Sequence, residues 1–180
     1  MNKRLTYFLV RGLVFIPGLF PKWSIKILPK VTFWILCHVI KYRKSIIQEN
    51  LNRCFPSQNI EKITTQYYRF LSMVTIEPFF TLKLSEDYLK SRVYGEYSEI
   101  VKAGKEGKNA ITLLGHMGNW EWLSAVAPLY VTPFQVVCIY KKMSNPFMEK
   151  YINKARSKYG AICVEMKELP RFLIKARKEI

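Results

Sequence analysis

Apolar residues along this 180-residue chain follow two different spacings, and the first gives way to the second beyond the middle of the sequence. From Ile60 to Val74 they recur every three or four residues, which predicts an amphipathic helix. Asn59 is a suitable N-cap for that helix, and Pro78 is expected to end or kink it. We expect its aromatic stripe in the core, with an acyl-chain groove as the alternative. From Asn109 onward, short apolar runs of strand length alternate with helix-length segments.

These two patterns predict helical structure over residues 46–90 and an α/β region over residues 91–180. Strands are expected at Ile111–Leu114, Phe134–Tyr140 and Ala161–Val164, with a shorter one at Val93–Tyr94. Helices are expected at Tyr97–Ala103, Leu123–Tyr130, Pro146–Tyr159 and from Leu169 to Ile180. Strands that alternate with helices favour a parallel sheet with right-handed crossovers. The predicted fold class is therefore α/β, a mostly parallel sheet flanked by helices.

The first 45 residues contain two apolar stretches with basic flanks. The run Leu5–Phe20 is apolar apart from Arg11, and its 16 residues would extend about 24 Å as a helix, short of the ~30 Å hydrocarbon layer. No small-residue cleavage site follows it, and the second stretch, Val31–Ile40, is shorter still. The pattern favours an uncleaved membrane anchor at the cytoplasmic leaflet over residues 1–45, with a pair of buried core helices as the alternative.

The amino-acid composition limits which classes of protein this chain can belong to. Hydrophobic residues make up 49% and aromatic residues 14% of the chain, which excludes a disordered protein and suits one domain with a sizeable core. The net charge of +16 suits an anionic partner, either a nucleic acid or an acidic membrane surface. The four cysteines are widely spaced and form no Cys-x-x-Cys pair, so we expect free thiols and no zinc site. They are Cys37, Cys54, Cys138 and Cys163.

The candidate chemistry lies where the predicted strand Ile111–Leu114 turns into the next helix. His116 sits in this turn, and Glu121 follows five residues later, in the first turn of the helix. A neutral imidazole can take a proton from a hydroxyl group, and a neighbouring carboxylate can fix its tautomer. Gly115 and Gly118 have no Cβ, so a substrate can approach the backbone, and Asn119 is a plausible N-cap. A hydrogen-bonded turn histidine beside a solvated glutamate is the alternative.

This stretch carries a resemblance to a known family. Gly-His-Met-Gly-Asn-Trp-Glu resembles the His-x4-Asp/Glu motif of glycerolipid acyltransferases, in the form found in the lipid A biosynthesis (lauroyl/myristoyl) acyltransferases. The segments Lys41–Ser57 and Tyr140–Gly160 are similar to that family's upstream and downstream blocks, in the same order. Members of the family continue further, with more strands. The resemblance therefore implies that the α/β part of this chain, an acyltransferase-like domain from residue 46, is incomplete at its C-terminus.

The resemblance implies an acyltransferase that moves a fatty acyl group from an acyl carrier protein or coenzyme A thioester to a hydroxyl of a lipid A precursor. His116 would be the general base and Glu121 its orienting partner. Backbone N–H groups around Gly118, Asn119 and Trp120 would stabilise the oxyanion, without any further cofactor. The remaining implications are an anionic glycolipid acceptor and a place at the cytoplasmic face of the inner membrane.

Basic side chains near the motif are candidates for binding phosphate groups of the acceptor or of the donor. Lys141 and Lys142 follow the second predicted strand, and Arg156 lies along the next helix. The family pattern usually has arginine near Lys141, so the lysine keeps the charge but loses the bidentate fork. Solvated surface charges are the alternative for each of them.

Three other classes of function compete with the acyltransferase. A nucleic-acid-binding module would explain the charge of +16, but the basic residues are spread along the chain and no RNA-binding motif is present, so we expect no nucleic-acid partner. A non-catalytic membrane scaffold would explain the apolar N-terminal segment. A hydrolase is the third class, and although Ser124 lies near His116, no nucleophile elbow surrounds it.

Overall fold

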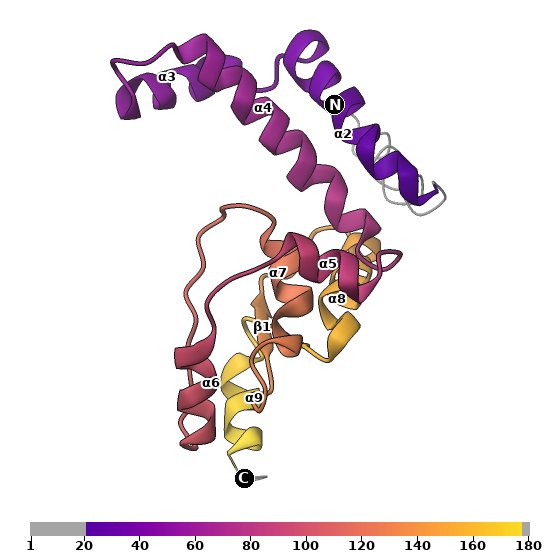
Figure 1. The fold of residues 1–180 in the computed structure, drawn as a ribbon, viewed down its shortest axis with the longest axis vertical. Coiled ribbons are helices and arrows are strands. Elements are labelled where there is room, and N and C mark those ends of the chain that lie inside the picture. The colour runs from indigo at the N-terminus through magenta and orange to yellow at the C-terminus, as the bar shows by residue number, and fades with distance from the viewer. Residues whose placement is uncertain (1–20, 178–180) are drawn as a thin grey trace.

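The computed structural model of the protein describes residues 21–177, which are mostly helical (Figure 1). The helices are α2 (Leu28–Trp34), α3 (Lys44–Cys54), α4 (Ile60–Ile76), α5 (Glu86–Arg92), α6 (Ser98–Lys105), α7 (Trp120–Val126), α8 (Pro146–Arg156) and α9 (Leu169–Ala176). The strands are β1 (Val137–Tyr140) and β2 (Ile162–Glu165). Short 3₁₀ segments lie at Lys22–Lys26, Glu77–Phe80, Ala127–Leu129 and Ser157–Tyr159, and a π-helical segment lies at Ile35–Val39.

Helices α2, α3 and α4 lie together at one end of the molecule, and the segments from α5 to α9 form the other end (Figure 1). Helix α4 packs against both α2 and α3. The predicted cap of α4 is confirmed, because the Asn59 side chain accepts a hydrogen bond of 3.0 Å from the Lys62 backbone N–H. The Tyr68 hydroxyl is fixed by a 2.8 Å bond to the Tyr42 carbonyl. This bond ties α4 to the segment that precedes α3.

The predicted helix after Asn59 is confirmed, but its buried face was predicted wrongly. The side chains that are buried lie four residues apart, and two of them carry aliphatic hydroxyl groups; they are Thr64, Tyr68, Ser72 and Ile76. Both hydroxyls are satisfied within the helix, because Thr64 donates to the Ile60 carbonyl and Ser72 to the Tyr68 carbonyl. Small polar residues therefore allow α2 and α3 to approach α4 closely. The predicted aromatic stripe is half-buried or exposed instead.

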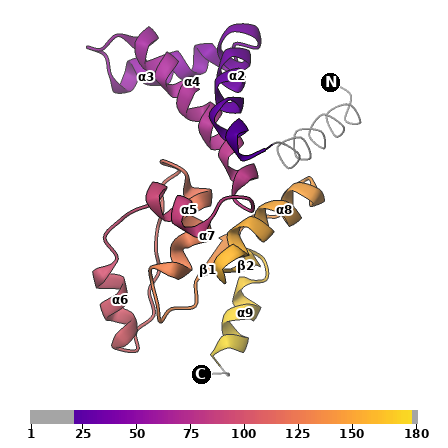
Figure 2. The ribbon, with the colours of Figure 1, turned by 45° about the vertical axis from the view of Figure 1, so that its right-hand side comes forward.

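The sheet of the described residues has two parallel strands, β1 and β2, in the register Cys138 opposite Cys163. Helix α8 lies between them in sequence, as expected for a crossover connection. Asn145 caps α8 by accepting hydrogen bonds from the Phe147 and Met148 N–H groups. The prediction of parallel strands that alternate with helices is thus confirmed for this part of the chain. Figure 2 shows β1 and β2 beside α8, with α9 leading away from them.

The predicted central strand at Ile111–Leu114 is wrong. No strand pairs with this segment within residues 21–177, and Ile111 and Leu113 are 92% and 91% exposed. The segment runs in extended form between α6 and α7 (Figure 1). Since an extended chain becomes a strand only by hydrogen bonding to a neighbour, an apolar run alone does not make one. The short strand predicted at Val93–Tyr94 is absent for the same reason.

The core lies where the end of α4 meets α5 and α7. Phe80 and Leu89 are fully buried there, and Trp122 is 2% exposed. Burying side chains of this size contributes about 1.5–3 kcal/mol each. Helix α7 is therefore held firmly along its buried face, which fixes the residues at its start. Tyr130 extends the core toward α6, because its ring stacks on Tyr97 at a centroid distance of 4.8 Å.

The predicted anchor is only partly described, because the run Leu5–Phe20 lies outside residues 21–177. Among the described helices, none is by itself long and apolar enough to cross a membrane. Taken together, the helical stretches Lys22–Val39 and Lys44–Cys54 are long and apolar enough to cross a membrane, but they are bent by 95° relative to each other. The alternative of two buried core helices is not supported for Val31–Ile40, since α2 and Ile35–Val39 contain no buried residue.

Candidate functional site

The start of α7 is fixed by a hydrogen-bonded cap. The Asn119 side-chain oxygen accepts a 3.0 Å bond from the Trp122 N–H, which confirms the predicted N-cap. The amide nitrogen of the same side chain donates to the Glu77 carboxylate at 2.7 Å. The indole nitrogen of Trp122 donates to the Glu77 backbone carbonyl at 3.3 Å. Glu77 thus connects the end of α4 to the first turn of α7, on which the motif lies.

The turn that precedes α7 depends on one glycine. Gly118 has a φ of +61°, in the left-handed region that glycine adopts without penalty. A Cβ at this position would have no atom within 4 Å, so the backbone faces open space on that side. Gly115 has no positive φ, and its Cβ would make ordinary contact with Met117. The backbone of the turn is therefore accessible at Gly118.

His116 is exposed on this turn, and its ring packs against Trp120. The two ring centroids are 4.9 Å apart, with an angle of 67° between the planes. Within the described residues, neither nitrogen of the His116 imidazole has a hydrogen-bond partner. The indole thus supports one side of the imidazole, while both ring nitrogens remain accessible. A substrate hydroxyl can therefore reach this imidazole.

Glu121 forms an ion pair with Arg156, from the last turn of α8. Arg156 Nε donates to Oε2 and Nη2 donates to Oε1 of Glu121, both at 2.7 Å. The two side chains are only 15% and 13% exposed, respectively. Burial lowers the pKa of Arg156, but the hydrogen bonds and the charge of Glu121 outweigh this effect and raise it above its ordinary value. Two parallel hydrogen bonds fix both the position and the orientation of the Glu121 carboxylate relative to the Arg156 guanidinium, so the pair holds α7 and α8 together.

The predicted site residues are thus brought together only in part. Arg156, which was predicted to bind substrate phosphates, is paired with Glu121 in this structure. Lys141 and Lys142 follow β1 directly, as predicted, and both are exposed. No hydrogen bond joins His116 to Glu121 in the structure described by residues 21–177. The catalytic roles of these two residues remain predictions.

Two parts of this arrangement were missed from the sequence. Glu77 lies 42 residues before Asn119, and no local pattern marks it as the partner of the cap. The pairing of Glu121 with Arg156, 35 residues apart, also had no local signal. An alternation of strands and helices predicts that α7 and α8 are neighbours, but not which of their charged residues meet.

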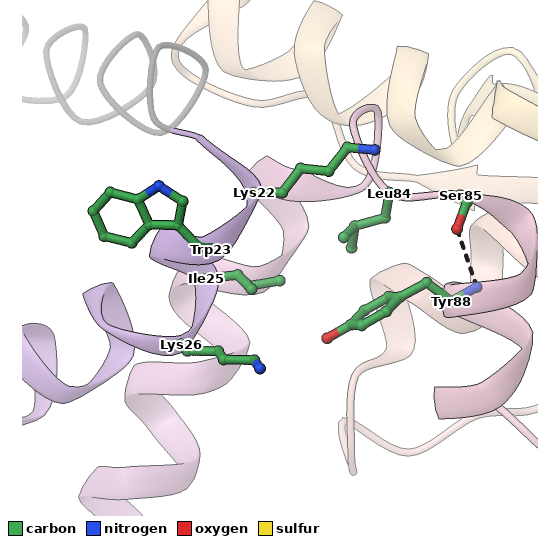
Figure 3. Close-up of a pocket in the computed structure, with 7 residues that line it drawn as sticks. All are labelled: Lys22, Trp23, Ile25, Lys26, Leu84, Ser85 and Tyr88. Carbon is green, nitrogen blue, oxygen red and sulfur yellow. Dashed lines mark hydrogen bonds between the residues drawn. The ribbon is translucent and has the colours of Figure 1, made fainter.

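A separate pocket of about 220 Å³ lies between the Lys22–Lys26 segment and α5. Figure 3 shows Ile25, Leu84 and Tyr88 around it, with the amino groups of Lys22 and Lys26 near its rim. None of the residues around this pocket belongs to the His116 turn. The pocket and the motif are therefore distinct features of the surface.

Comparison with known proteins places the chain in a family. No curated protein and no solved structure gives a match. The family of bacterial lipid A biosynthesis acyltransferases, in contrast, matches residues 1–179, which is nearly the whole sequence. The match spans the His116 turn together with the segments that the sequence placed upstream and downstream of it. The chain therefore belongs to the bacterial lipid A biosynthesis acyltransferase family, and it is an acyltransferase of that pathway.

Proposed function

We propose that this acyltransferase moves a fatty acyl group from an acyl carrier protein or coenzyme A thioester to a hydroxyl of a lipid A precursor. The observation that carries the proposal is the family match over residues 1–179, which includes the motif from His116 to Glu121. The exposed His116 imidazole is consistent with it, because an acceptor hydroxyl has to reach the base directly. No covalent enzyme intermediate is needed for this transfer.

In the proposed reaction, His116 takes the proton of the acceptor hydroxyl as its oxygen attacks the thioester carbonyl carbon. The tetrahedral intermediate then collapses, the carbon–sulfur bond breaks, and the proton on the imidazole passes to the leaving thiolate. The open backbone at Gly118, next to the first turn of α7, offers N–H groups to the oxyanion. Asn119 and Trp120 complete this proposed binding segment, since the cap of one and the ring contact of the other fix its shape.

Glu121 is proposed to orient the His116 imidazole while it stays bound to Arg156. An ionised carboxylate accepts up to about four hydrogen bonds, so two bonds from Arg156 leave capacity for an imidazole N–H. The role of Arg156 is then to hold Glu121 ionised and in place, rather than to bind phosphate. The exposed Lys141 and Lys142 are the cations proposed for the phosphate groups of the substrates.

We also propose that the protein works at the cytoplasmic face of the inner membrane. Large apolar side chains are exposed on the N-terminal helices, among them Trp23, Trp34, Val39 and Ile40. Lysines flank these positions, and the whole chain carries a charge of +16. Apolar and basic groups on the same segment favour an anionic lipid surface. This location would bring the enzyme to an acceptor that is itself a membrane lipid.

The test is an acyl-transfer assay on membranes that contain this chain. A lipid A precursor is supplied with acyl carrier protein thioesters or coenzyme A thioesters of matched acyl groups, and products are identified by mass spectrometry. The proposal predicts a precursor heavier by one acyl chain with at least one donor class, and no such product in membranes without the chain. Salt-dependent binding of nucleic acid without any acylated product would contradict it.

A further inference from the structure

Two cysteines face each other across the small sheet, outside the acyltransferase motif. Cys138 of β1 and Cys163 of β2 are register partners in a parallel pair. Side chains of such partners point to the same face of the sheet. Neighbouring strands lie about 4.8 Å apart, which is within the Cα separation of about 4.4–6.8 Å that disulfides span. The backbone thus holds the two thiols at a separation that a disulfide bond can span.

Polar groups surround the sulfur of Cys163 in particular. The Ser157 hydroxyl lies 3.5 Å from Cys163 Sγ, and the Asn153 carbonyl lies 3.7 Å away. Cys138 Sγ lies 3.9 Å from the Ser124 carbonyl. The guanidinium of Arg156, held by Glu121, is close enough to act on both sulfurs electrostatically. The Asn153 carbonyl accepts from the Cys163 thiol, whereas the Ser157 hydroxyl can donate to its sulfur. Cys163 therefore has one hydroxyl donor and a cation near it, as reactive thiolates do.

These surroundings make the two thiols unequal. A hydrogen bond from Cys138 is the largest cause that lowers the pKa of Cys163 to about 6, against the opposing effect of burial. Ser157 and the charge of Arg156 lower it further, whereas Glu121 acts to raise it. The same hydrogen bond and burial raise the pKa of Cys138. At neutral pH the pair is thus a thiolate beside a neutral thiol.

We propose that Cys138 and Cys163 are a peroxide-reactive dithiol that closes a reversible disulfide across the sheet. The Cys163 thiolate attacks one oxygen of hydrogen peroxide, the O–O bond breaks, and a sulfenic acid and hydroxide result. The Cys138 sulfur then attacks the sulfenic sulfur, and the hydroxyl leaves as water with the proton of the Cys138 thiol. The two sulfurs together lose two electrons to the peroxide. This modification does not depend on which acyl donor the enzyme uses.

The other two cysteines provide an internal comparison. Cys54, at the end of α3, is exposed, and Cys37 is half-buried, as Cys138 and Cys163 are. If access alone decided reactivity, Cys54 would react first. Selective oxidation of Cys163 would therefore report its surroundings rather than its exposure.

The test uses the reduced full-length chain with one equivalent of hydrogen peroxide at pH 7. Remaining thiols are alkylated, and the peptides are analysed by mass spectrometry without reduction. The expected product links the Cys138 and Cys163 peptides and disappears on treatment with dithiothreitol, while Cys37 and Cys54 stay alkylatable. The Cys138→Ser variant should instead accumulate a Cys163 sulfenic acid that dimedone traps. The double variant Cys37→Ser/Cys54→Ser serves as the control and should form the disulfide as the parent chain does.

Three results would overturn the proposal. Oxidation of Cys54 ahead of Cys163 would show that exposure governs reactivity. A disulfide between Cys163 and a cysteine other than Cys138 would show that the sheet does not select the partner. A Cys163 that remains fully alkylatable in the folded chain after peroxide treatment would show that it is not reactive.

Discussion

Replacing Arg156 by glutamine is expected to destabilise the packing of α7 against α8. The change removes both 2.7 Å bonds to Glu121 and leaves a carboxylate that is only 15% exposed without its cation. Breaking a fully buried ion pair in this way costs about 3–5 kcal/mol. Because both partners keep some contact with water, we expect a loss of about 2–3 kcal/mol in the free energy of unfolding.

The matched control is Arg53→Gln on α3. Arg53 and Glu49 form an ion pair with an N–O distance of 2.6 Å, but their side chains are 73% and 60% exposed. Pairs of this kind contribute about 0–1 kcal/mol, so the control should change stability little. The comparison separates the effect of burial from that of removing one positive charge.

The assay is urea unfolding followed by tryptophan fluorescence, since Trp122 is buried next to Glu121 in α7. The double variant Glu121→Gln/Arg156→Gln should be more stable than the sum of the two single changes predicts, by about 1 kcal/mol or more. Equal effects of Arg156→Gln and Arg53→Gln would refute the reasoning. Strict additivity of the two single changes would refute it as well.

Three further changes test other parts of the site. Gly118→Ala should cost about 1–2 kcal/mol in unfolding experiments, because the new residue must keep a φ of +61°, whereas Gly115→Ala should have little effect. Asn119→Ala should cost about 1–2 kcal/mol by removing the cap of α7, and loss of helical circular dichroism on mild heating would report it. The rate at which iodoacetamide alkylates Cys163 should rise with pH as the thiolate forms and be half-maximal near pH 6; Cys138→Ala should move this midpoint upward, because alanine cannot donate the hydrogen bond that is the largest cause of the lowered pKa. Unchanged stability of the Gly118 variant would contradict the first expectation, and unchanged circular dichroism of the Asn119 variant would contradict the second. An unchanged midpoint of Cys163 alkylation would contradict the third.

Local features of the chain were predictable because they depend on neighbouring residues. Asn59, Asn119 and Asn145 all precede helices, and each accepts hydrogen bonds from the first turn of its helix. The alternation of strands and helices gave β1 and β2 within a few residues of their true bounds. Caps and periodicity act over a few residues, so the sequence alone carries them.

Features that depend on distant partners were not predictable in the same way. The apolar segment Ile111–Leu114 has the composition of a buried strand, but no strand pairs with it among residues 21–177. The sequence also did not indicate that the Glu121 carboxylate forms an ion pair with Arg156. Both outcomes are decided by which elements pack together, and an alternation of elements does not specify individual side-chain contacts. The buried face of α4 shows the same limit, because the face that meets α2 and α3 includes Thr64 and Ser72 and not the predicted aromatic stripe.

The proposed reaction depends most on His116 as the base that activates an alcohol. The direct test compares the rate of acyl transfer of His116→Ala with that of His38→Ala, a change at another exposed histidine, whose ring contacts Phe33 at 5.9 Å. Both variants should keep the circular dichroism of the parent chain. Removal of a general base predicts a rate lower by about 10²–10⁴-fold for His116→Ala, with His38→Ala near the parent rate. A His116→Ala enzyme that transfers acyl groups as fast as the parent would contradict the account.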